Sequence, residues 1–455
     1  MSDHSDQQNL ESMIQEAGGA VNLLRRGVLG QFRPPGYQAE FTNWREEQRA
    51  WTTGVALLEQ SYHMPELHLR GSEVIPFLKE FTVNKYDPFP VMRAKQLVSA
   101  GPDGNLISDA IIFREEEDFF RVVGDPAWLQ FNLEKSSYDI TQKLFPNWFG
   151  THYPRDVYRF QLQGPHALSL MSDLVQGELP DVKFFHIAEL EIAGRSVRAL
   201  RHGMAGTPGF EIYGPWEEKE QVIAAVEVAG RKYDLKKVGA AAYPTTSQES
   251  GWMPVPLPAI YSSPELKEFR EWLEGNSMYA IGFLGGSMTS TNIEDYYIDP
   301  IEAGYGSFID WGRDFIGSGP LKLKAESPRR RKVTLVWNDD DVADVIASSL
   351  FDVDDRAQWV TFPMPHNGFY VSDIVRTGSG EQVGVSQWSS FSERARHIIS
   401  TAIIDLEHAE PGTELELVWG NPDVSSAFSD ARATHVIRAT VAPSPYFSKD
   451  IKSEK

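Results

Sequence analysis

The chain has 455 residues and contains no cysteine. This absence excludes disulfide bonds, thiolate metal sites and catalysis by a cysteine nucleophile. The sequence also lacks an apolar run of about 18 residues, the length that a membrane-spanning helix needs. Residues 1–6 contain neither the basic nor the apolar region of a signal peptide. We therefore expect a cytoplasmic protein that has no membrane partner.

Positive charge and histidine are scarce as well. The 64 aspartates and glutamates outnumber the 43 lysines and arginines, which gives a formal charge of −21. Such a surface repels nucleic acid. None of the 11 histidines has the spacing of metal ligands. The acidic run 339–344 lacks the glycine and spacing of a calcium loop, and predicts a helix start capped by Asn338 or Asp339 instead. We expect neither a nucleic-acid partner nor a metal ion.

The remaining composition is that of a soluble globular protein, with 41% hydrophobic and 24% charged residues. The length predicts two or three domains. Hydrophobic spacing predicts helices at 41–58, 71–81, 165–175 and 217–230, and strands at 55–69, 107–113, 119–123 and 158–162. We expect a linker at 317–331. Beyond it, short strands at 333–337, 383–387, 414–419 and 434–441 predict a small antiparallel barrel.

The most informative segment is 201–215. Its glycines and proline predict a tight turn, which a short alternating strand follows. On that strand Phe210 and Ile212 share one face, and Glu211 points to the other. A carboxylate held on a strand can accept two parallel hydrogen bonds from a flat N–H/NH2 edge such as that of a pterin ring. From the residues alone, a solvated glutamate on a strand is the simpler alternative.

The same segment resembles the Arg-x-Gly-x-x-Gly-x-x-Gly-x-Glu motif of the aminomethyltransferase (glycine cleavage T-protein) superfamily. Further stretches that are similar to the superfamily follow in order at 161–165, 299–306, 314–317, 378–384 and 441–446. The resemblance implies an α+β fold of the three-domain cloverleaf type. Two interleaved α/β lobes in residues 1–320 would surround a folate cavity, and residues 332–455 would form a C-terminal β-barrel. It also implies that Glu211 grips tetrahydrofolate.

Four blocks are more similar to tetrahydrofolate-dependent aryl O-demethylases of the vanillate and syringate type: 41–45, 200–206, 242–252 and 292–297. This resemblance implies transfer of the methyl group of a methoxylated aromatic acid to N5 of tetrahydrofolate, in the breakdown of lignin-derived aromatics. The products would be 5-methyltetrahydrofolate and a phenol. Tyr243 would face the substrate, and Trp252 would border the folate. A core aromatic residue beside a proline turn is the alternative role for Tyr243.

The segment 59–64 is similar to the Asp-x-Ser-His-Met entry of the folate cavity in these relatives. A buried structural histidine is the alternative for His63. With Tyr243, His63 is a candidate hydrogen-bond donor to the leaving oxygen, so we predict both as catalytic. The other residues that the resemblance suggests for the site are Asp109, Gln163 and Tyr213 beside the cofactor, and Phe32, Arg33, Gln60, Met64 and Asp125 beside the substrate.

Two departures from the family pattern affect the substrate. Vanillate-type enzymes have an arginine where Asp125 follows Gly124, and an aspartate repels a benzoate carboxylate but can accept a hydrogen bond from a phenol. Either Arg33 replaces that arginine or the ring binds in another orientation, and we expect syringate before vanillate. Asp125 can instead cap the turn before Pro126. Ser108 replaces the aspartate that serves the amine chemistry of glycine cleavage.

Three other functions stay open: an aminomethyltransferase of the glycine-cleavage type, a demethylase of another methyl donor such as a sulfonium or chloroaromatic compound, and a folate-binding regulatory protein without turnover. Ser108 and the block at 242–244 count against the first. The sequence leaves the oligomeric state open.

Overall fold

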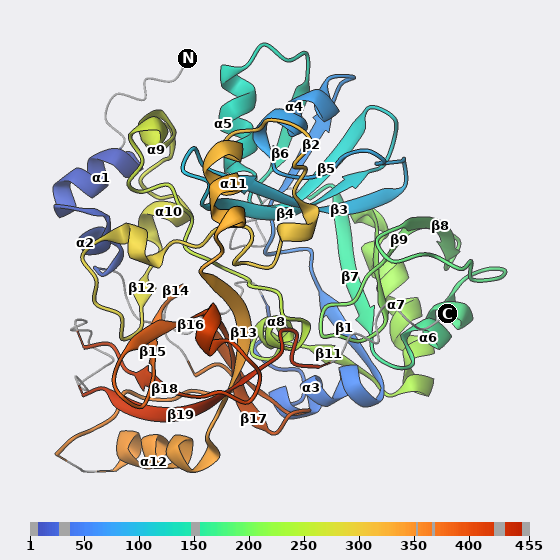
Figure 1. The fold of residues 1–455 in the computed structure, drawn as a ribbon. Coiled ribbons are helices and arrows are strands. Elements are labelled where there is room, and N and C mark those ends of the chain that lie inside the picture. The colour runs from blue at the N-terminus through green and yellow to red at the C-terminus, as the bar shows by residue number, and fades with distance from the viewer. Residues whose placement is uncertain are drawn as a thin grey trace.

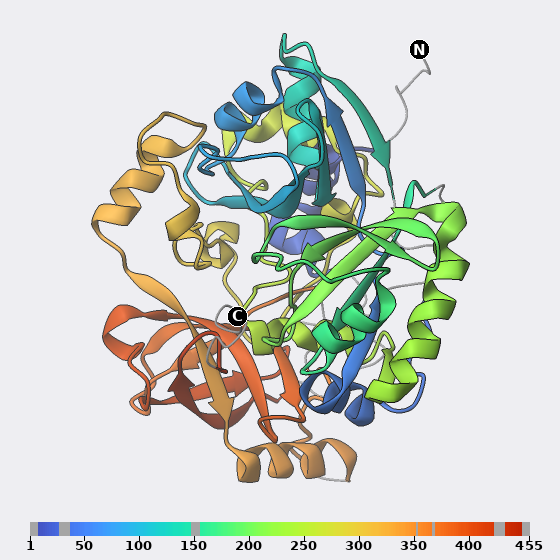
Figure 2. The ribbon, with the colours of Figure 1, turned by 90° about the vertical axis from the view of Figure 1, so that its right-hand side faces the viewer.

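The computed structural model describes residues 8–26, 37–146, 155–351, 354–365, 369–422 and 433–447. Three lobes meet around a common centre (Figures 1 and 2). Two lobes are built on open sheets covered by helices, and the third is a closed barrel. This arrangement agrees with the predicted α+β cloverleaf.

The first sheet has six strands in the order β11-β1-β7-β10-β9-β8. Helices α6 and α7 pack on one of its faces, where Phe210 and Ile212 join their core. Glu211 therefore lies on the opposite face, as the alternation predicts. The bounds are β1 Val55–Glu59, β7 Val157–Gln163, β8 Ile187–Ile192, β9 Arg195–Arg201, β10 Gly209–Pro215, β11 Leu235–Val238, α6 Ala167–Leu174 and α7 Lys219–Gly230.

The second sheet has five strands in the order β3-β4-β5-β2-β6, so β3 lies at its edge. The chain leaves the first sheet after β1, builds this whole sheet, and returns at β7; the two lobes are therefore interleaved, as expected. The strands predicted at 107–113 and 119–123 are confirmed as β4 and β5, which pair as an antiparallel hairpin. The bounds are β2 Glu66–Arg70, β3 Arg93–Ala100, β4 Leu106–Arg114, β5 Phe119–Gly124 and β6 Thr141–Phe145.

The barrel closes in the order β13-β17-β16-β15-β18-β19, which confirms the predicted C-terminal barrel. Asn338 caps its helix α12 by accepting from the Asp341 N–H at 3.1 Å, one of the two predicted caps. A two-stranded pair, β12 with β14, lies beside it. The bounds are β12 Leu284–Gly285, β13 Arg330–Trp337, β14 Tyr370–Val371, β15 Asp373–Arg376, β16 Gln382–Ser392, β17 His397–Asp405, β18 Glu414–Trp419, β19 His435–Ala442 and α12 Asp339–Leu350.

Three predicted segments differ in the structure. The single strand expected at 55–69 is wrong, because β1 and β2 are separate strands in different sheets. The expected linker 317–331 is wrong in its conformation, because helix α11 (Ser318–Glu326) fills most of it and its last residues already belong to β13. Leu321 of α11 is fully buried, which anchors the helix. The helix expected at 41–58 is shorter: α3 (Trp44–Thr53) ends at Gly54, and β1 follows at once. The division into units 1–320 and 332–455 stays a prediction.

Gly164 is the glycine of the Gln-Gly-Pro sequence at the end of β7. Its φ is +132°, and a Cβ there would lie 2.4 Å from the Gly54 carbonyl oxygen. Only glycine tolerates both conditions. The close approach holds the end of α3 against the start of α6 and thereby fixes β1 and β7 beside each other.

The remaining helices are α1 Leu10–Ala17, α2 Ala20–Leu24, α4 Val74–Phe81, α5 Ala127–Lys135, α8 Thr246–Ser250, α9 Lys267–Trp272 and α10 Met278–Ile281. They add to the large core around the second sheet, except α8, which packs against the barrel. Among the described helices, none has both the length and the apolar character needed to cross a bilayer.

Candidate functional site

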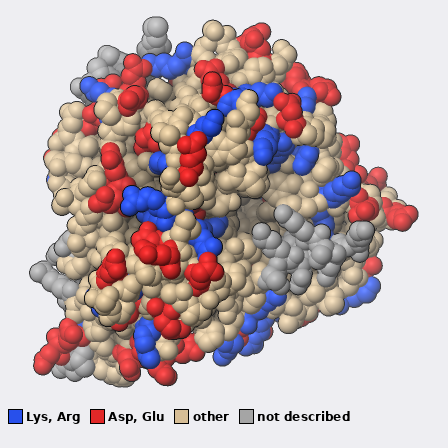
Figure 3. Space-filling view, in the orientation of Figure 1, with Lys and Arg blue, Asp and Glu red and all other residues tan. Residues whose placement is uncertain are grey.

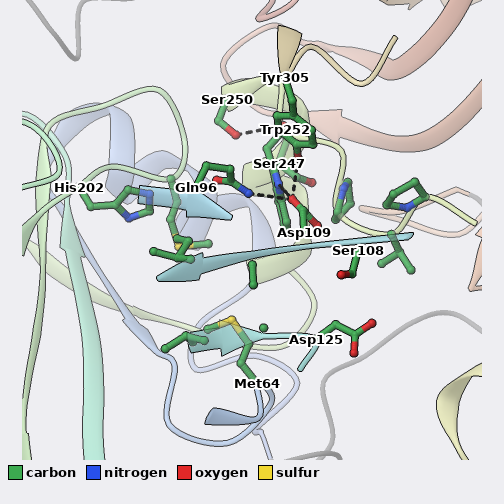
Figure 4. A pocket seen from close by; sticks show the side chains of 18 of the residues that line it. Met64, Gln96, Ser108, Asp109, Asp125, His202, Ser247, Ser250, Trp252 and Tyr305 are labelled. Carbon is green, nitrogen blue, oxygen red and sulfur yellow. Dashed lines mark hydrogen bonds between the residues drawn. The ribbon is translucent and has the colours of Figure 1, made fainter. Parts of the chain in front are cut away.

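A cavity of about 860 Å³ lies where the three lobes meet. Edge strand β3 and strand β4 form one wall, the segment after β1 and strand β10 another, and α8 with the residues after it a third. Figure 3 shows the molecule hollowed in this face, and Figure 4 shows the interior. The predicted residues that line the cavity are Gln60, His63, Met64, Asp109, Asp125, Glu211, Tyr243 and Trp252.

Four predicted residues are not part of this wall. Phe32 and Arg33 fall outside the described residues. Gln163 and Tyr213 are buried behind the wall: the Gln163 Oε1 accepts from the Met204 N–H at 2.6 Å, and the Tyr213 ring packs edge-on against Phe113. Their roles at the cofactor stay predictions.

Glu211 begins a chain of buried ion pairs. Its Oε1 accepts from Nη1 of Arg159, whose Nε donates to Glu66 at 2.6 Å. The other oxygen of Glu66 accepts from Arg121 at 2.6 Å, and the Arg121 Nε donates to Glu115 at 3.0 Å. Each of these five residues is buried. Charges of alternating sign thus run from the cavity wall through both sheets.

The same contacts govern the titration of Glu66. Burial alone raises the pKa of its carboxyl group, but the charges of Arg159 and Arg121 outweigh burial and hold that pKa well below its usual range. Glu66 is therefore ionised at neutral pH, and the chain keeps its alternating charges.

Tyr243 lies in a short 3₁₀ turn at Tyr243–Thr245, with its hydroxyl group in the cavity wall. The Gln60 Nε2 donates to this hydroxyl oxygen at 3.2 Å. Burial raises the pKa of Tyr243, so the group is a neutral phenol at neutral pH. Within the described part of the chain, no acceptor takes its hydroxyl hydrogen. That hydrogen is therefore available to a ligand.

His63 packs against Tyr243 edge to face, with ring centroids 4.9 Å apart. Its Nδ1 lies 2.8 Å from the Tyr37 hydroxyl oxygen, which also accepts from the Tyr62 N–H at 3.3 Å. We assign the Tyr37 hydroxyl hydrogen to Nδ1, which leaves the proton of His63 on Nε2. Burial lowers the pKa of His63 to about 4, so the ring is neutral at neutral pH.

Asp109 collects three donors on one oxygen, as Figure 4 shows. Its Oδ2 accepts from Gln96 and Trp252 at 2.9 Å each and from the Tyr305 hydroxyl at 2.6 Å. Burial raises the pKa of this carboxyl group, while the Tyr305 and Trp252 hydrogen bonds oppose the rise. The contacts fix the Trp252 indole, 38% exposed, as a flat part of the wall.

Asp125 has the capping role, one of the two alternatives that the sequence left open. Its Oδ1 accepts from the Ala127 N–H at 3.1 Å at the start of α5, which confirms the capping role. Its Oδ2 accepts from the Tyr279 hydroxyl, and the residue also lines the cavity. Burial raises the pKa of the Asp125 carboxyl group. Whether it contacts a substrate stays a prediction.

Sequence reasoning missed several residues of the site: Tyr37, Gln96, Tyr279, Tyr305, and the cations Lys85, Arg93 and Lys95. Tyr305 lies inside the family-like stretch 299–306, so that stretch was a signal. The others have no local signal, since their position depends on contacts between segments far apart in sequence. In the described ranges, no three His, Asp or Glu side chains are grouped as metal ligands.

Comparisons with known proteins agree with this architecture. The sequence profile of the GCVT N-terminal domain matches residues 24–255. A syringate O-demethylase of a Sphingobium species is 38% identical over 96% of both chains. A sesamin methylene transferase of a Sinomonas species is 30% identical over 94% of this chain and 93% of its own. A crystal structure of the glycine cleavage system aminomethyltransferase T from Bartonella henselae is similar to this structure. The match covers 98% of this chain and 99% of the aminomethyltransferase chain, with a TM-score of 0.61 and 16% sequence identity. The two proteins therefore have the same fold.

The ion-pair chain generates a stability prediction. Arg159→Met removes the cation between Glu211 and Glu66 and leaves buried negative charge unpaired. The variant should lose about 3–5 kcal/mol of unfolding free energy, the range for breaking a buried pair. The matched control Arg331→Met breaks the exposed pair with Glu410 and should cost at most about 1 kcal/mol. Denaturant unfolding followed by tryptophan fluorescence measures the unfolding free energy of both variants. Equal losses in the two variants would contradict a structural role for the buried ion pairs.

Proposed function

The chain belongs to the family with a GCVT N-terminal domain, and on this premise we propose that it is a tetrahydrofolate-dependent aryl O-demethylase. It transfers the methyl group of a methoxylated aromatic acid to N5 of tetrahydrofolate. The observation that carries the proposal is a buried cavity with an anchored carboxylate, Glu211, on one wall and a neutral donor, Tyr243, on another. Likeness to a syringate O-demethylase over nearly the whole length supports this reaction.

The residues present fit a folate. Glu211 has one oxygen held by Arg159, and its Oε2 has no protein partner within the described ranges. This oxygen faces a cavity that lies at the upper end of the usual range for ligand pockets, about 300–1,000 Å³, which suits two ligands at once. Glu211 would accept the N–H groups of the pterin, and Trp252 would lie along its plane. Gln163 and Tyr213 would support them from behind the wall.

When bound, tetrahydrofolate supplies N5 as the methyl acceptor. In the balanced reaction the carbon–oxygen bond of the ether would be replaced by a carbon–nitrogen bond to N5, and the proton released from N5 would balance the proton taken up by the phenolate oxygen. Tyr243 donates its free hydroxyl hydrogen to the leaving oxygen as negative charge develops there. His63, neutral and protonated on Nε2, is the second donor. One such donor typically contributes about 10²–10³-fold to the rate.

Alignment is the other demand on the protein. A neutral amine attacks a methyl carbon only when nitrogen, carbon and oxygen are nearly collinear, and holding two reactants this way is worth about 7–11 kcal/mol. Gln60 orients the Tyr243 hydroxyl, and Met64 and Phe113 add apolar surface to the cavity wall. This surface excludes water, which would otherwise compete for the donors.

One observation favours a second candidate substrate class. The likeness to a sesamin methylene transferase suggests a methylenedioxy ring as an alternative donor to a methoxy group. Ser108 in the cavity wall counts against glycine-cleavage chemistry, which uses an aspartate at that turn. The two donor classes differ in the carbon group that reaches tetrahydrofolate: a methyl group from a methoxy donor and a methylene group from a methylenedioxy donor.

A donor panel tests the proposal. The protein is incubated with tetrahydrofolate and syringate, vanillate, methylenedioxybenzoate or dimethylsulfoniopropionate, and the folate product is identified by mass. We expect 5-methyltetrahydrofolate and a phenol from syringate. Methylenetetrahydrofolate from the methylenedioxy compound would support the second class. Folate binding without product from any donor would identify a regulatory protein instead.

Glu211→Gln should weaken tetrahydrofolate binding by about 1.5–3 kcal/mol, because a hydrogen bond to a charged acceptor is replaced by one to a neutral amide. Titration calorimetry measures the change. Glu191→Gln, an exposed glutamate on β8 of the same sheet, is the matched control and should bind normally. Unchanged affinity in a folded Glu211 variant would refute the anchor role.

Tyr243→Phe keeps the ring and removes only the donor. Turnover should fall by about 10²-fold or more, with little change in the melting temperature. Tyr158→Phe is the control, since Tyr158 is a fully buried tyrosine outside the cavity wall and should leave turnover intact. Near-normal turnover of the Tyr243 variant would leave His63 as the donor.

Asp125→Asn keeps a side chain that can cap α5 and contact Tyr279 but removes negative charge from the cavity. The KM for syringate should fall by up to about fivefold, the equivalent of about 1 kcal/mol of charge repulsion. The KM for syringaldehyde, which has no carboxylate, should not change. Steady-state kinetics with both donors measures the two KM values. If the substitution changes both KM values equally, Asp125 does not interact with the substrate carboxylate.

A further inference from the structure

His202 is a residue of the cavity wall that the reaction proposed above does not use. It directly follows strand β9, and its N–H donates to the Gly209 carbonyl of β10 at 3.2 Å. Because side chains alternate along a strand, His202 lies on the same face of the sheet as Leu200, which pairs with Glu211 in the register of β9 and β10. His202 and Glu211 therefore belong to one wall of the cavity, and Figure 4 shows the His202 ring apart from the group around Asp109.

The contacts of Gln161 determine which ring nitrogen of His202 carries the hydrogen. Gln161 pairs with Glu211 in the register of β7 and β10 and is fully buried. Its Nε2 donates to the His202 carbonyl at 3.0 Å and to the Leu162 carbonyl at 3.4 Å, which fixes the orientation of the amide group. Its Oε1 lies 3.4 Å from the Nδ1 of His202. Because an amide oxygen can only accept, Nδ1 carries the hydrogen, and the Nε2 of His202 has a free lone pair.

The surroundings hold the His202 ring in this orientation. A Cβ at Gly209 would lie 2.8 Å from the Nε2 of Gln161, so a larger residue there would displace the amide group that contacts the ring. The ring of Phe185 packs edge-on against His202 with centroids 5.4 Å apart, and the ring of Phe184 lies at 6.3 Å. The free lone pair of Nε2 therefore has a defined position in the wall.

The Nε2 of His202 is an acceptor without a protein donor in the described part of the chain. Burial lowers the pKa of His202 below its ordinary value, and the charge of Glu211 opposes this shift only in part. The ring is therefore neutral at neutral pH and keeps its lone pair. The wall thus offers two acceptors from adjacent strands: this nitrogen and the Oε2 of Glu211.

Two acceptors on one wall suit a flat ring that has two adjacent N–H donors. The pterin of tetrahydrofolate has such an edge, which its 2-amino group and the neighbouring N3–H form. A free carboxylate can accept both hydrogens with its two oxygens, but Arg159 already occupies one oxygen of Glu211. Without a second acceptor, one N–H of the pterin would be buried unpaired, which weakens binding.

We propose that His202 binds the pterin together with Glu211: the Nε2 of His202 accepts one hydrogen of the edge formed by the 2-amino group and N3–H, and the Oε2 of Glu211 accepts the other. Gln161 is a positioning residue, since it acts only through the tautomer of His202. The inference rests on the proposed function for the identity of the ligand. Donation of a hydrogen to a neutral imidazole is the chemistry involved, and the phenolic hydroxyl group of the aryl donor is the competing source of that hydrogen.

Two substitutions of His202 test the contact by calorimetric titration with tetrahydrofolate in the absence of an aryl donor. His202→Asn keeps a donor near the position of Nδ1 but removes the acceptor at Nε2, so the dissociation constant should rise about threefold to tenfold, the equivalent of one lost hydrogen bond. His202→Gln places an amide oxygen near the position of Nε2 and should recover most of the affinity. His166→Asn, the same substitution at an exposed histidine outside the cavity wall, is the matched control and should bind like wild type.

Nitrogen-15 NMR of histidine-labelled wild type tests the same contact without relying on the stability of His202→Asn. The His202 signals are identified by their absence from the spectrum of His202→Gln. In the free protein Nδ1 should carry the hydrogen, and added tetrahydrofolate should shift the Nε2 signal as it accepts a hydrogen bond. A protonated Nε2, or an Nε2 signal that tetrahydrofolate leaves unchanged, overturns the proposal. Gln161→Leu removes the acceptor for Nδ1–H, so a tautomer with hydrogen on Nε2 should appear; its absence would refute the positioning role.

The outcomes separate the possible failures. If wild type binds tetrahydrofolate and a folded His202→Asn binds it equally well, the contact is wrong and the proposed function stands. If His202→Asn raises the KM for syringate and leaves the affinity for tetrahydrofolate unchanged, Nε2 accepts from the aryl donor and the pterin assignment is wrong. If wild type does not bind tetrahydrofolate, the proposed function fails and the role of His202 fails with it.

Discussion

The buried charges that begin at Glu211 are the constraint on which the rest of the site depends. Glu211 and Arg159 belong to the six-stranded sheet, while Glu66 and Arg121 belong to the five-stranded sheet, so the ion pairs join the two lobes. Removing charges from water is expensive, and the loss is recovered only when each charge has its partners in good geometry. The two sheets can therefore shift relative to each other only by as much as the hydrogen-bond lengths between these side chains tolerate. The same requirement fixes the one oxygen of Glu211 that remains for a ligand.

The barrel closes the site in a comparable way, although it contributes few residues to the wall. Lys332 of β13 donates to the carbonyls of Gly251 and Ala303 at 2.7 Å each. Gly251 precedes Trp252, and Ala303 lies two residues before Tyr305, and both side chains hold Asp109. One barrel lysine thus positions two donors that come from separate loops. On the far side of α8, Glu249 accepts from Ser392 of the barrel at 2.6 Å and from Trp51 of α3 at 3.1 Å.

The sequence predicts those features that depend on the spacing of hydrophobic residues along one element or on a contiguous motif. The face of Glu211 follows from strand alternation, and the barrel follows from its short strands. Features built by distant segments were not accessible. Asp109 receives its donors from residues 96, 252 and 305, and the tautomer of His63 depends on Tyr37. Glu115 lies in the charged segment between the two predicted strands 107–113 and 119–123. It is nevertheless only 3% exposed, because folding brings its partners Arg121 and Arg198 to it.

The two ends of the proposed reaction place opposite demands on one cavity, and the structure separates them. Anchoring a flat N–H edge favours a full negative charge, which a buried site tolerates only beside a cation such as Arg159. A departing phenolate needs donors that hold a transferable hydrogen in the resting protein, and a neutral phenol or the N–H of a neutral imidazole supplies one. Burial provides these neutral donors: it holds His63 uncharged and raises the pKa of Tyr243, and the same low dielectric strengthens the hydrogen bond that Tyr243 can donate.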